Sequence, residues 1–216
     1  MTTMSVLDGF SRLLVLCAHT DDEFGCAGTI SRMAKAGAKI KYVALSRCEE
    51  SVPEGYERDV LEKECRLCTE CLGIEKADID VFGYAVRHFP QHRQDILERF
   101  VAINRAYKPD LVLLPSSFDT HQDHETVFHE GFRAFKHATL LGYEMPQNLI
   151  SFQHSAFVPL TEDDLKKKIE ALGHYRSQTF RPYATPEFIR GLAAVRGVQC
   201  NAPFAEAFEV IRLILR

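Results

Sequence analysis

The sequence contains no apolar run that approaches the roughly 20 residues that a bilayer-spanning helix needs. The N-terminal stretch MTTMSVLDGFSRLLVLCA superficially resembles a signal peptide, but its apolar core is short and Asp8 lies upstream of that core. No clean small-x-small cleavage site follows it. We therefore expect a lead-in and a first strand here, with no membrane span. This predicts a cytoplasmic protein whose seven cysteines stay reduced.

The sequence also lacks a strong excess of one charge. The net charge is −4 and the sequence pI is about 6.1, so neither nucleic acid nor an anionic membrane is expected as a partner. No repeat, low-complexity segment or linker rich in Gly, Ser or Pro marks a boundary within the chain. Residues 1–216 are therefore predicted to form a single domain.

Short apolar runs alternate with helical patterns along the chain, which predicts βαβ units. The runs LLVL and LVLL are continuous, as expected of strands buried on both faces. The predicted fold class is α/β, a Rossmann-like three-layer sandwich with a mostly parallel sheet and helices on both faces. The predicted strands are 12–18, 39–46, 79–82, 111–114 and 148–153. The predicted helices run from Gly25 or Gly28 to Gly37 and over 59–72, 94–107, 123–136 and 162–175, the last clear one, before a tail of mixed signals.

Two polar clusters directly follow predicted strands. AHTDDE (18–23) follows the first strand, and DTHQDHE (119–125) follows LVLL. Ligands of an open parallel sheet bind outside the carboxyl ends of its strands, so we expect the two clusters to converge there. Their imidazoles and carboxylates suit a borderline cation such as zinc. The alternative is a core histidine at His19, followed by acids that merely favour the start of a helix.

These clusters resemble two motifs of a known family. AHTDDE and HQDH are similar to A-H-P-D-D-E and H-x-D-H, which mark the LmbE-like or PIG-L-type zinc-dependent N-deacetylases. The stretches DEFGCAGTI, ALGHYRSQ and AEAF resemble further segments of that family, so the resemblance runs from about residue 12 to about residue 212. The chain departs from the family at Thr20, where proline is usual, and at Cys48 and Ser51, where glycines are usual.

The resemblance implies a division of labour among the clustered residues. It implies His19, Asp22 and His124 as ligands of Zn²⁺, with Fe²⁺ or another divalent metal as the open alternative, and Asp21 as the general base.

Further roles follow for the remaining residues of the clusters. We predict that a protonated His121 stabilises the charged carbonyl oxygen and protonates the leaving amine, and that Asp123 orients it. The alternative for Asp123 is a helix N-cap. For Glu23, capping of the first helix is preferred over support of the metal site.

Other charged loops and a cysteine motif have plainer interpretations. Arg47, Glu49 and Arg58 are taken as solvated, with a substrate role for one of them left open. The basic stretch YAVRHFPQHR, which contains Arg87, His88, His92 and Arg93, suits a phosphate or carboxylate, but a solvated loop is preferred. In CRLCTEC, the spacing of Cys65, Cys68 and Cys71 favours the core face of a helix over an iron–sulfur or zinc site.

Together these features predict a metal-dependent hydrolase. It would remove an N-acetyl group from a small-molecule amino sugar, a nucleotide-linked amino sugar or a related glycoconjugate. The non-enzymatic alternative is a nucleotide- or metal-binding α/β module, although no G-x-G-x-x-G or P-loop follows a strand. An iron–sulfur protein is the third possibility, and a homo-oligomer is left open.

Overall fold

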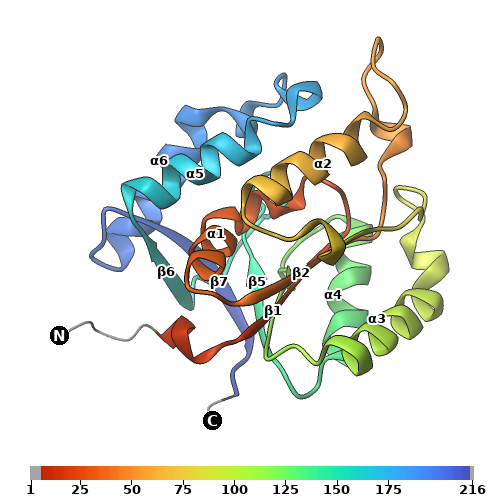
Figure 1. Ribbon diagram of the computed structural model, residues 1–216, viewed down its shortest axis with the longest axis horizontal. Coiled ribbons are helices and arrows are strands. Elements are labelled where there is room, and N and C mark those ends of the chain that lie inside the picture. The colour runs from red at the N-terminus through yellow and green to blue at the C-terminus, as the bar shows by residue number, and fades with distance from the viewer. Residues whose placement is uncertain (1–5, 215–216) are drawn as a thin grey trace.

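The computed structural model describes residues 6–214, so residues 1–5 of the predicted lead-in lie outside the described part (Figure 1). Within it, strands pair into a seven-stranded sheet of order β3-β2-β1-β4-β5-β7-β6. The strands are β1 (Arg12–Cys17), β2 (Lys39–Ala44), β3 (Ile79–Val81), β4 (Leu111–Pro115), β5 (Thr139–Tyr143), β6 (Ala156–Leu160) and β7 (Phe204–Arg212). Strands β1 to β5 are parallel, whereas β7 runs antiparallel to β5 and β6. The predicted mostly parallel sheet is confirmed.

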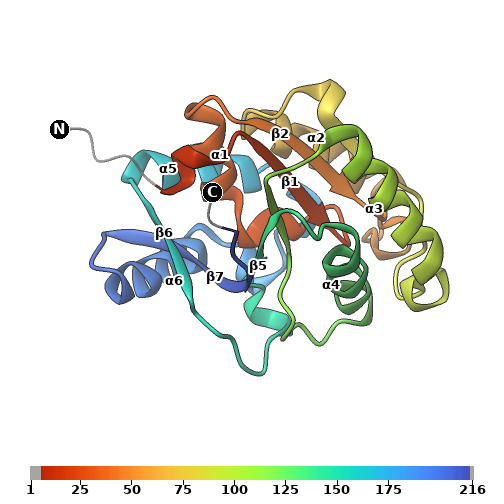
Figure 2. The ribbon, with the colours of Figure 1, turned by 90° about the horizontal axis from the view of Figure 1, so that it is seen from below.

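Helices cover both faces of this sheet. They are α1 (Ala27–Lys35), α2 (Val60–Cys71), α3 (Arg93–Tyr107), α4 (Gln122–Ala134), α5 (Glu162–Leu172) and α6 (Pro186–Gln199). Figures 1 and 2 place α1, α2 and α5 on one face and α3 and α4 on the other.

Alternate residues of β1 belong to two separate core layers. Leu13, Val15 and Cys17 pack in the layer shared with α1, α2, α5 and α6, whereas Leu14 and Leu16 pack in the layer shared with α3 and α4. Burial of both faces explains why the strand is a continuous apolar run. The predicted three-layer architecture is confirmed.

In the C-terminal half, one expected strand is wrong, and strands β5 and β6 and helix α6 were not predicted. Residues 148–153 form no strand: the segment makes an isolated bridge between Leu149 and Asp119, and Ile150 is 92% exposed. Its apolar residues have no sheet face to bury against. Helix α6 was not predicted, because Val195 and Val198 face solvent and blur the apolar periodicity.

The mixed signals of the tail resolve into strand β7 because it inserts between β5 and β6. This strand also fixes the start of α1. The Glu206 carboxylate on β7 accepts hydrogen bonds from the backbone N–H groups of Gly28 (2.9 Å) and Thr29 (2.7 Å). It also forms an ion pair with Lys168 of α5 (2.7 Å). A Cβ at Gly28 would come within 2.6 Å of Leu160 Cδ1. The DEFGCAGTI and AEAF segments therefore join at the helix that follows AHTDDE.

The cysteines of CRLCTEC lie on α2. Cys65 and Cys68 are fully buried in the core, and Cys71 is partly buried against it. All three are free thiols. The predicted core packing of this motif is confirmed.

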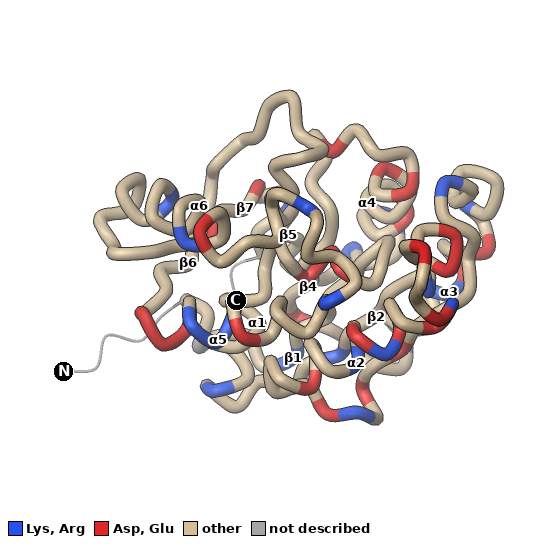
Figure 3. The backbone as a smooth tube through the Cα atoms, turned by 90° about the horizontal axis from the view of Figure 1, so that it is seen from above, with Lys and Arg blue, Asp and Glu red and all other residues tan. Residues whose placement is uncertain are grey.

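Among residues 6–214, no helix combines the length and the apolar character that crossing a bilayer requires. Figure 3 shows acidic and basic residues interspersed along the backbone in that view.

Candidate metal and catalytic site

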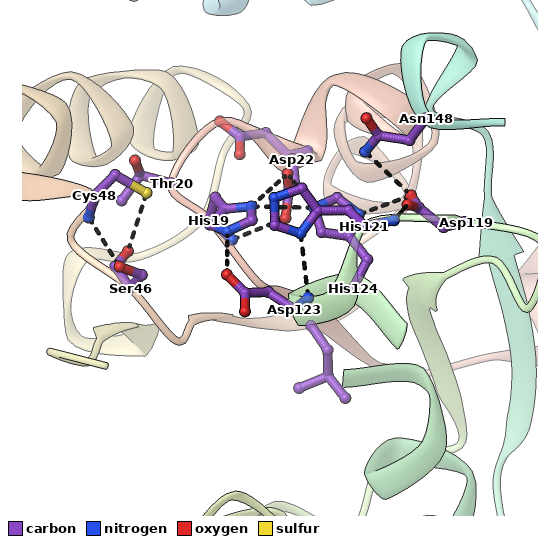
Figure 4. Close-up of polar contacts among 12 residues, drawn as sticks. His19, Thr20, Asp22, Ser46, Cys48, Asp119, His121, Asp123, His124 and Asn148 are labelled. Carbon is purple, nitrogen blue, oxygen red and sulfur yellow. Dashed lines mark hydrogen bonds and ion pairs between the residues drawn. The ribbon is translucent and has the colours of Figure 1, made fainter. Parts of the chain in front are cut away.

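The two polar clusters meet at the carboxyl edge of the sheet. AHTDDE leaves β1 and enters the short helix η2 (Asp22–Gly25), while HQDH forms the start of α4 after β4. Strands β1 and β4 are parallel neighbours, so both loops emerge at the same edge. His19, Asp21, His121 and His124 line one cavity of about 210 Å³ at that edge. The expected convergence is confirmed (Figure 4).

Three donor atoms form a compact triangle in this cavity. His19 Nδ1 lies 3.1 Å from His124 Nε2. Asp22 Oδ1 lies 3.7 Å from His19 Nδ1 and 3.3 Å from His124 Nε2. A tetrahedral metal with bonds of about 2.0–2.2 Å separates its ligand atoms by about 3.3–3.6 Å, so this triangle fits a small divalent ion. His121 also lies close, since the three histidines offer ligand atoms within 4.8 Å of one another.

Each histidine of the triangle is held by a carboxylate on its other ring nitrogen. Asp123 Oδ2 lies 3.1 Å from His19 Nε2, and Asp119 Oδ2 lies 2.8 Å from His124 Nδ1. Carboxylates of this kind fix the tautomer and orientation of metal-binding histidines. They leave His19 Nδ1 and His124 Nε2 as the free ligand atoms, which are the two that face each other.

Asp119 is a site residue that the sequence reasoning missed. Besides His124, its carboxylate accepts a hydrogen bond from the His121 backbone N–H (2.9 Å) and a longer one from the Asn148 side chain (3.4 Å). It is buried, at 7% exposure. The available signal was its place in DTHQDHE, two residues before the first histidine.

The partners of Asp123 differ from those predicted. Its carboxylate contacts His19 and accepts hydrogen bonds from the backbone N–H groups of Arg87 (2.5 Å) and Phe89 (3.2 Å). His121, whose Nδ1 accepts from the Asp123 backbone N–H at 3.1 Å, is the N-cap of α4. Both expectations for Asp123 are corrected: its carboxylate does not orient His121, and it does not cap the helix. With the cap supplied by His121, the carboxylate is free to turn toward β1.

The same cap argues against a protonated His121. A nitrogen that accepts a hydrogen bond carries no proton, so Nδ1 is bare and the proton resides on Nε2. Burial, together with the neighbouring rings of His19 and His124, lowers the pKa of His121. We therefore revise the expected imidazolium to a neutral imidazole whose Nε2–H is a donor.

The adjacent acids of AHTDDE differ in their electrostatics. Burial opposes ionisation of Asp22, but His124 and His19 outweigh it and hold the pKa of Asp22 well below its usual range. Burial and the Asp22 carboxylate raise the pKa of Asp21. Asp22 is thus a fixed anion, whereas Asp21 is the more basic carboxylate of the pair. Asp21 also makes no ion pair within residues 6–214 and lines the cavity.

Glu23 supports the loop from behind and does not cap a helix, which corrects the preferred expectation. Its buried carboxylate accepts hydrogen bonds from the hydroxyls of Tyr42 (2.7 Å) and Tyr175 (2.5 Å). The Tyr175 hydroxyl also contacts the carbonyl oxygen of Thr20. Burial raises the pKa of Glu23 to about 7. The ALGHYRSQ segment therefore reaches AHTDDE through Tyr175.

The remaining loop residues divide between the cavity wall and the surface. Cys48, Ser51, Arg87 and Arg181 line the cavity, so the two family glycine positions lie beside the site. The cavity lining does not include Arg47, Glu49 or Arg58. Arg47 pairs with Glu62, and Arg58 pairs with Glu49. The rest of the basic stretch, His88, His92 and Arg93, also lies outside the lining.

Sequence comparison assigns this arrangement to a family. The profile of the family described as PIG-L, GlcNAc-PI de-N-acetylase, matches residues 14–135. The chain belongs to the PIG-L family. This segment contains both AHTDDE and HQDH. A curated relative, the uncharacterized deacetylase YaiS of Escherichia coli strain K12, is 26% identical over 172 residues, which cover 76% of the chain and 90% of YaiS.

Solved structures of similar fold span nearly all of this PIG-L family chain. N,N'-diacetylchitobiose deacetylase from Pyrococcus horikoshii superposes with a TM-score of 0.78 at 18% identity, over 94% of the chain and 84% of that protein. GalB, the 4-carboxy-2-hydroxymuconate hydratase from Pseudomonas putida KT2440, gives 0.75 at 20% identity, over 95% and 98%. At these identities the similarity establishes the fold.

Proposed function

We propose that the protein is a metal-dependent N-deacetylase that releases acetate from an N-acetylated amino sugar, free, nucleotide-linked or part of a glycoconjugate. The observation that carries the proposal is the donor triangle of His19, Asp22 and His124, with both imidazoles held by carboxylates. Membership in a deacetylase family supports the reaction. The names of YaiS and the diacetylchitobiose deacetylase support acetyl groups and amino sugars as the substrate class.

The proposed chemistry assigns a separate task to each side chain at the cavity. A divalent metal held by His19, Asp22 and His124 would lower the pKa of a bound water to about 7 and would polarise the amide carbonyl. Asp21 takes a proton from the attacking water as the water oxygen bonds to the carbonyl carbon of the amide. The Nε2–H of His121 donates to the oxygen that becomes negative. Asp21 then returns the proton to the amide nitrogen as the C–N bond breaks, which yields acetate and a free amine.

A second candidate is addition of water to a carbon–carbon double bond of an anionic substrate. GalB shares the fold and is named for such a hydration. Two arginines that line the cavity, Arg87 and Arg181, favour an anionic substrate. The two reactions differ in product, because only deacetylation releases acetate and an amine.

Metal analysis and a substrate panel test the proposal. We expect purified wild type to bind about one divalent ion per chain. His19→Ala should lose the ion, whereas the control His174→Ala should retain it, since His174 does not line the cavity. A panel of N-acetyl sugars, free and nucleotide-linked, is then scored for acetate and amine. Wild type that binds no divalent ion, or metal that persists in His19→Ala, would contradict the proposed site.

A further inference from the structure

Two residues of the cavity wall have backbone conformations that their side chains do not favour. The non-glycine residues with positive φ in residues 6–214 are Cys48 (58°), Arg87 (73°), Lys108 (51°) and Asn201 (56°). Lys108 ends α3 as its C-cap, and asparagine tolerates this region well. Cys48 and Arg87 have no such explanation, and both line the cavity. Strained backbone of this kind persists where the surroundings enforce it, often at ligand sites.

Asp123 holds the backbone of Arg87 in this conformation. Its Oδ2 accepts the Arg87 N–H at 2.5 Å and also lies 3.1 Å from His19 Nε2. Its Oδ1 accepts the Phe89 N–H at 3.2 Å. One buried carboxylate therefore fixes a proposed metal ligand and the chain that carries the Arg87 guanidinium. The shared carboxylate therefore fixes the position of the Arg87 backbone, from which the side chain extends, relative to the donor triangle.

Arg181 is held on a different segment of the same cavity. It lies between the short helices η7 (Arg176–Gln178) and η8 (Pro182–Ala184) and is partly buried. Its Nε donates to Gln178 Oε1 at 2.5 Å. Its guanidinium carbon lies 5.4 Å from the ring centre of Phe180 and 5.7 Å from that of Tyr183. These contacts order the guanidinium before any ligand arrives, which reduces the entropy lost on binding.

Neither guanidinium forms an ion pair within residues 6–214. Other arginines do: Arg196, which is partly buried, binds Glu144 at 2.9 Å, and Arg93, which is exposed like Arg87, binds Glu130 at 2.7 Å. The acids that share the cavity with Arg87 and Arg181 are Asp21 and Asp22, which the proposed function assigns to the proton and the metal. Two positive groups of the wall thus have no ion-pair partner among residues 6–214.

We infer that Arg87 and Arg181 form an anion-binding pair that selects substrates with a carboxylate or phosphate group remote from the N-acyl bond. The inference rests on the proposed deacetylation and specifies its substrate class. Guanidinium groups bind both anions through paired N–H donors, and their planar geometry provides specificity as well as affinity. A neutral N-acetyl sugar would leave both charges without a partner.

The kinetic test compares matched sugars and matched variants. N-acetylglucosamine is the neutral substrate, and its 1-phosphate, its 6-phosphate and N-acetylmuramic acid carry phosphate or carboxylate. For the preferred anionic sugar, Arg87→Gln and Arg181→Gln should each lower kcat/KM by about 10–100-fold, mainly through KM. The ratio of kcat/KM for the anionic sugar to that for the neutral sugar should fall by about tenfold or more, because the neutral sugar forms no ion pair with either guanidinium. Arg176→Gln is the control, because it removes the same charge from an exposed position outside the cavity lining.

A binding measurement separates this inference from the proposed reaction. Calorimetry on metal-loaded wild type should show tighter binding of an anionic sugar than of N-acetylglucosamine. Arg87→Gln and Arg181→Gln should each reduce this difference in affinity, and the two together should remove it. That result without acetate release would overturn the deacetylation and leave the anion site standing. Equal affinity for neutral and anionic sugars overturns the anion site. So does a preference that survives both substitutions, because the anion would then be bound by the metal. Whether the sugar phosphates or N-acetylmuramic acid bind more tightly shows whether the site prefers phosphate or carboxylate.

Discussion

The segment matched by the family profile, residues 14–135, and the segment that follows it, residues 136–214, contribute different parts of the site. The first segment contains the proposed ligands and catalytic groups: His19, Asp21, Asp22, His121, Asp123 and His124. The second segment adds residues that line the cavity, namely Asn148, Gln178, Arg181 and Tyr183. It also adds Tyr175, which supports the AHTDDE loop through Glu23. The proposed catalytic groups therefore all lie in the first segment, whereas the proposed anion-binding pair is divided, with Arg87 in the first segment and Arg181 in the second.

Topology explains this division. Strands β1 and β4 lie side by side, so their carboxyl ends bring the two motifs within hydrogen-bonding distance. The later elements β7, α5 and η7 pack behind and beside those loops. Glu206 anchors the start of α1, and Tyr175 anchors Glu23 and Thr20. Substitutions of the clustered residues 19–22 and 121–124 should therefore affect catalysis or metal binding directly, and those in the second segment should act through stability, position or substrate binding.

The strongest test of this contrast is Asp21→Asn. The substitution keeps the shape of the side chain but removes the base, and we expect kcat to fall by about 10³-fold. Bound metal should be unchanged, because Asp21 makes no ion pair with the histidines of the triangle in the described part of the chain. Turnover assays and metal analysis on one preparation give both values. Asp163→Asn, at an exposed position of α5, is the control. Full activity in Asp21→Asn would refute the assignment.

The matching test in the second segment is Glu206→Ala. It leaves Lys168 buried without its 2.7 Å partner and removes the acceptor for two backbone N–H groups. Breaking a buried pair on one side typically costs about 3–5 kcal/mol, so the free energy of unfolding should fall by about 3 kcal/mol. Urea titration measures it. Glu170→Ala, which disrupts an exposed pair with Lys167, should lower the free energy of unfolding far less. Equal losses in both variants would contradict the anchoring role.

Asp119→Asn tests the carboxylate behind His124. Loss of such a partner typically weakens metal binding by about 10–100-fold. Chelator competition should show that decrease, whereas Asp95→Asn, at an exposed position of α3, should bind metal as wild type does. Unchanged affinity in Asp119→Asn would mean that the 2.8 Å contact does not orient the ligand.

The pH dependence of metal binding has a defined sign. Burial disfavours a charged His124, but Asp22 and Asp119 outweigh burial and raise the pKa of His124 to about 10 in the metal-free protein. The ring is therefore protonated at neutral pH and must lose a proton before Nε2 can bind metal. Apparent affinity should rise with pH by up to about tenfold per unit between about pH 6 and pH 8 for each proton released. In Asp119→Asn the slope should flatten, since one cause of the raised pKa is removed. A wild-type affinity that is independent of pH in this range would contradict a protonated His124.

The sequence was informative where local patterns decide the structure. Continuous apolar runs predicted β1 and β4, and the polar clusters behind them predicted where the triangle lies. The sequence was uninformative where a contact with a residue distant in the chain decides the structure. The Asp123 carboxylate contacts His19, 104 positions away in the chain, and the mixed tail becomes a strand by inserting between two others. Arg181 was overlooked because nothing in its neighbourhood of the sequence indicates that it faces the cavity.

The smallest expected effect concerns the hydroxyl of Tyr175. Tyr175→Phe removes its hydrogen bond to Glu23 and its contact with the Thr20 carbonyl, while Tyr42 still binds the other Glu23 oxygen. Leaving a buried polar group without its hydrogen-bond partner costs about 1–3 kcal/mol, so the free energy of unfolding should fall by roughly that amount. Since Thr20 and Glu23 flank Asp21 and Asp22, kcat should also fall, by about fivefold if about 1 kcal/mol of the loss displaces those acids. Tyr56→Phe, at 47% exposure, is the control. A variant that loses stability but keeps kcat would show that the α1 end of the loop alone positions the two aspartates.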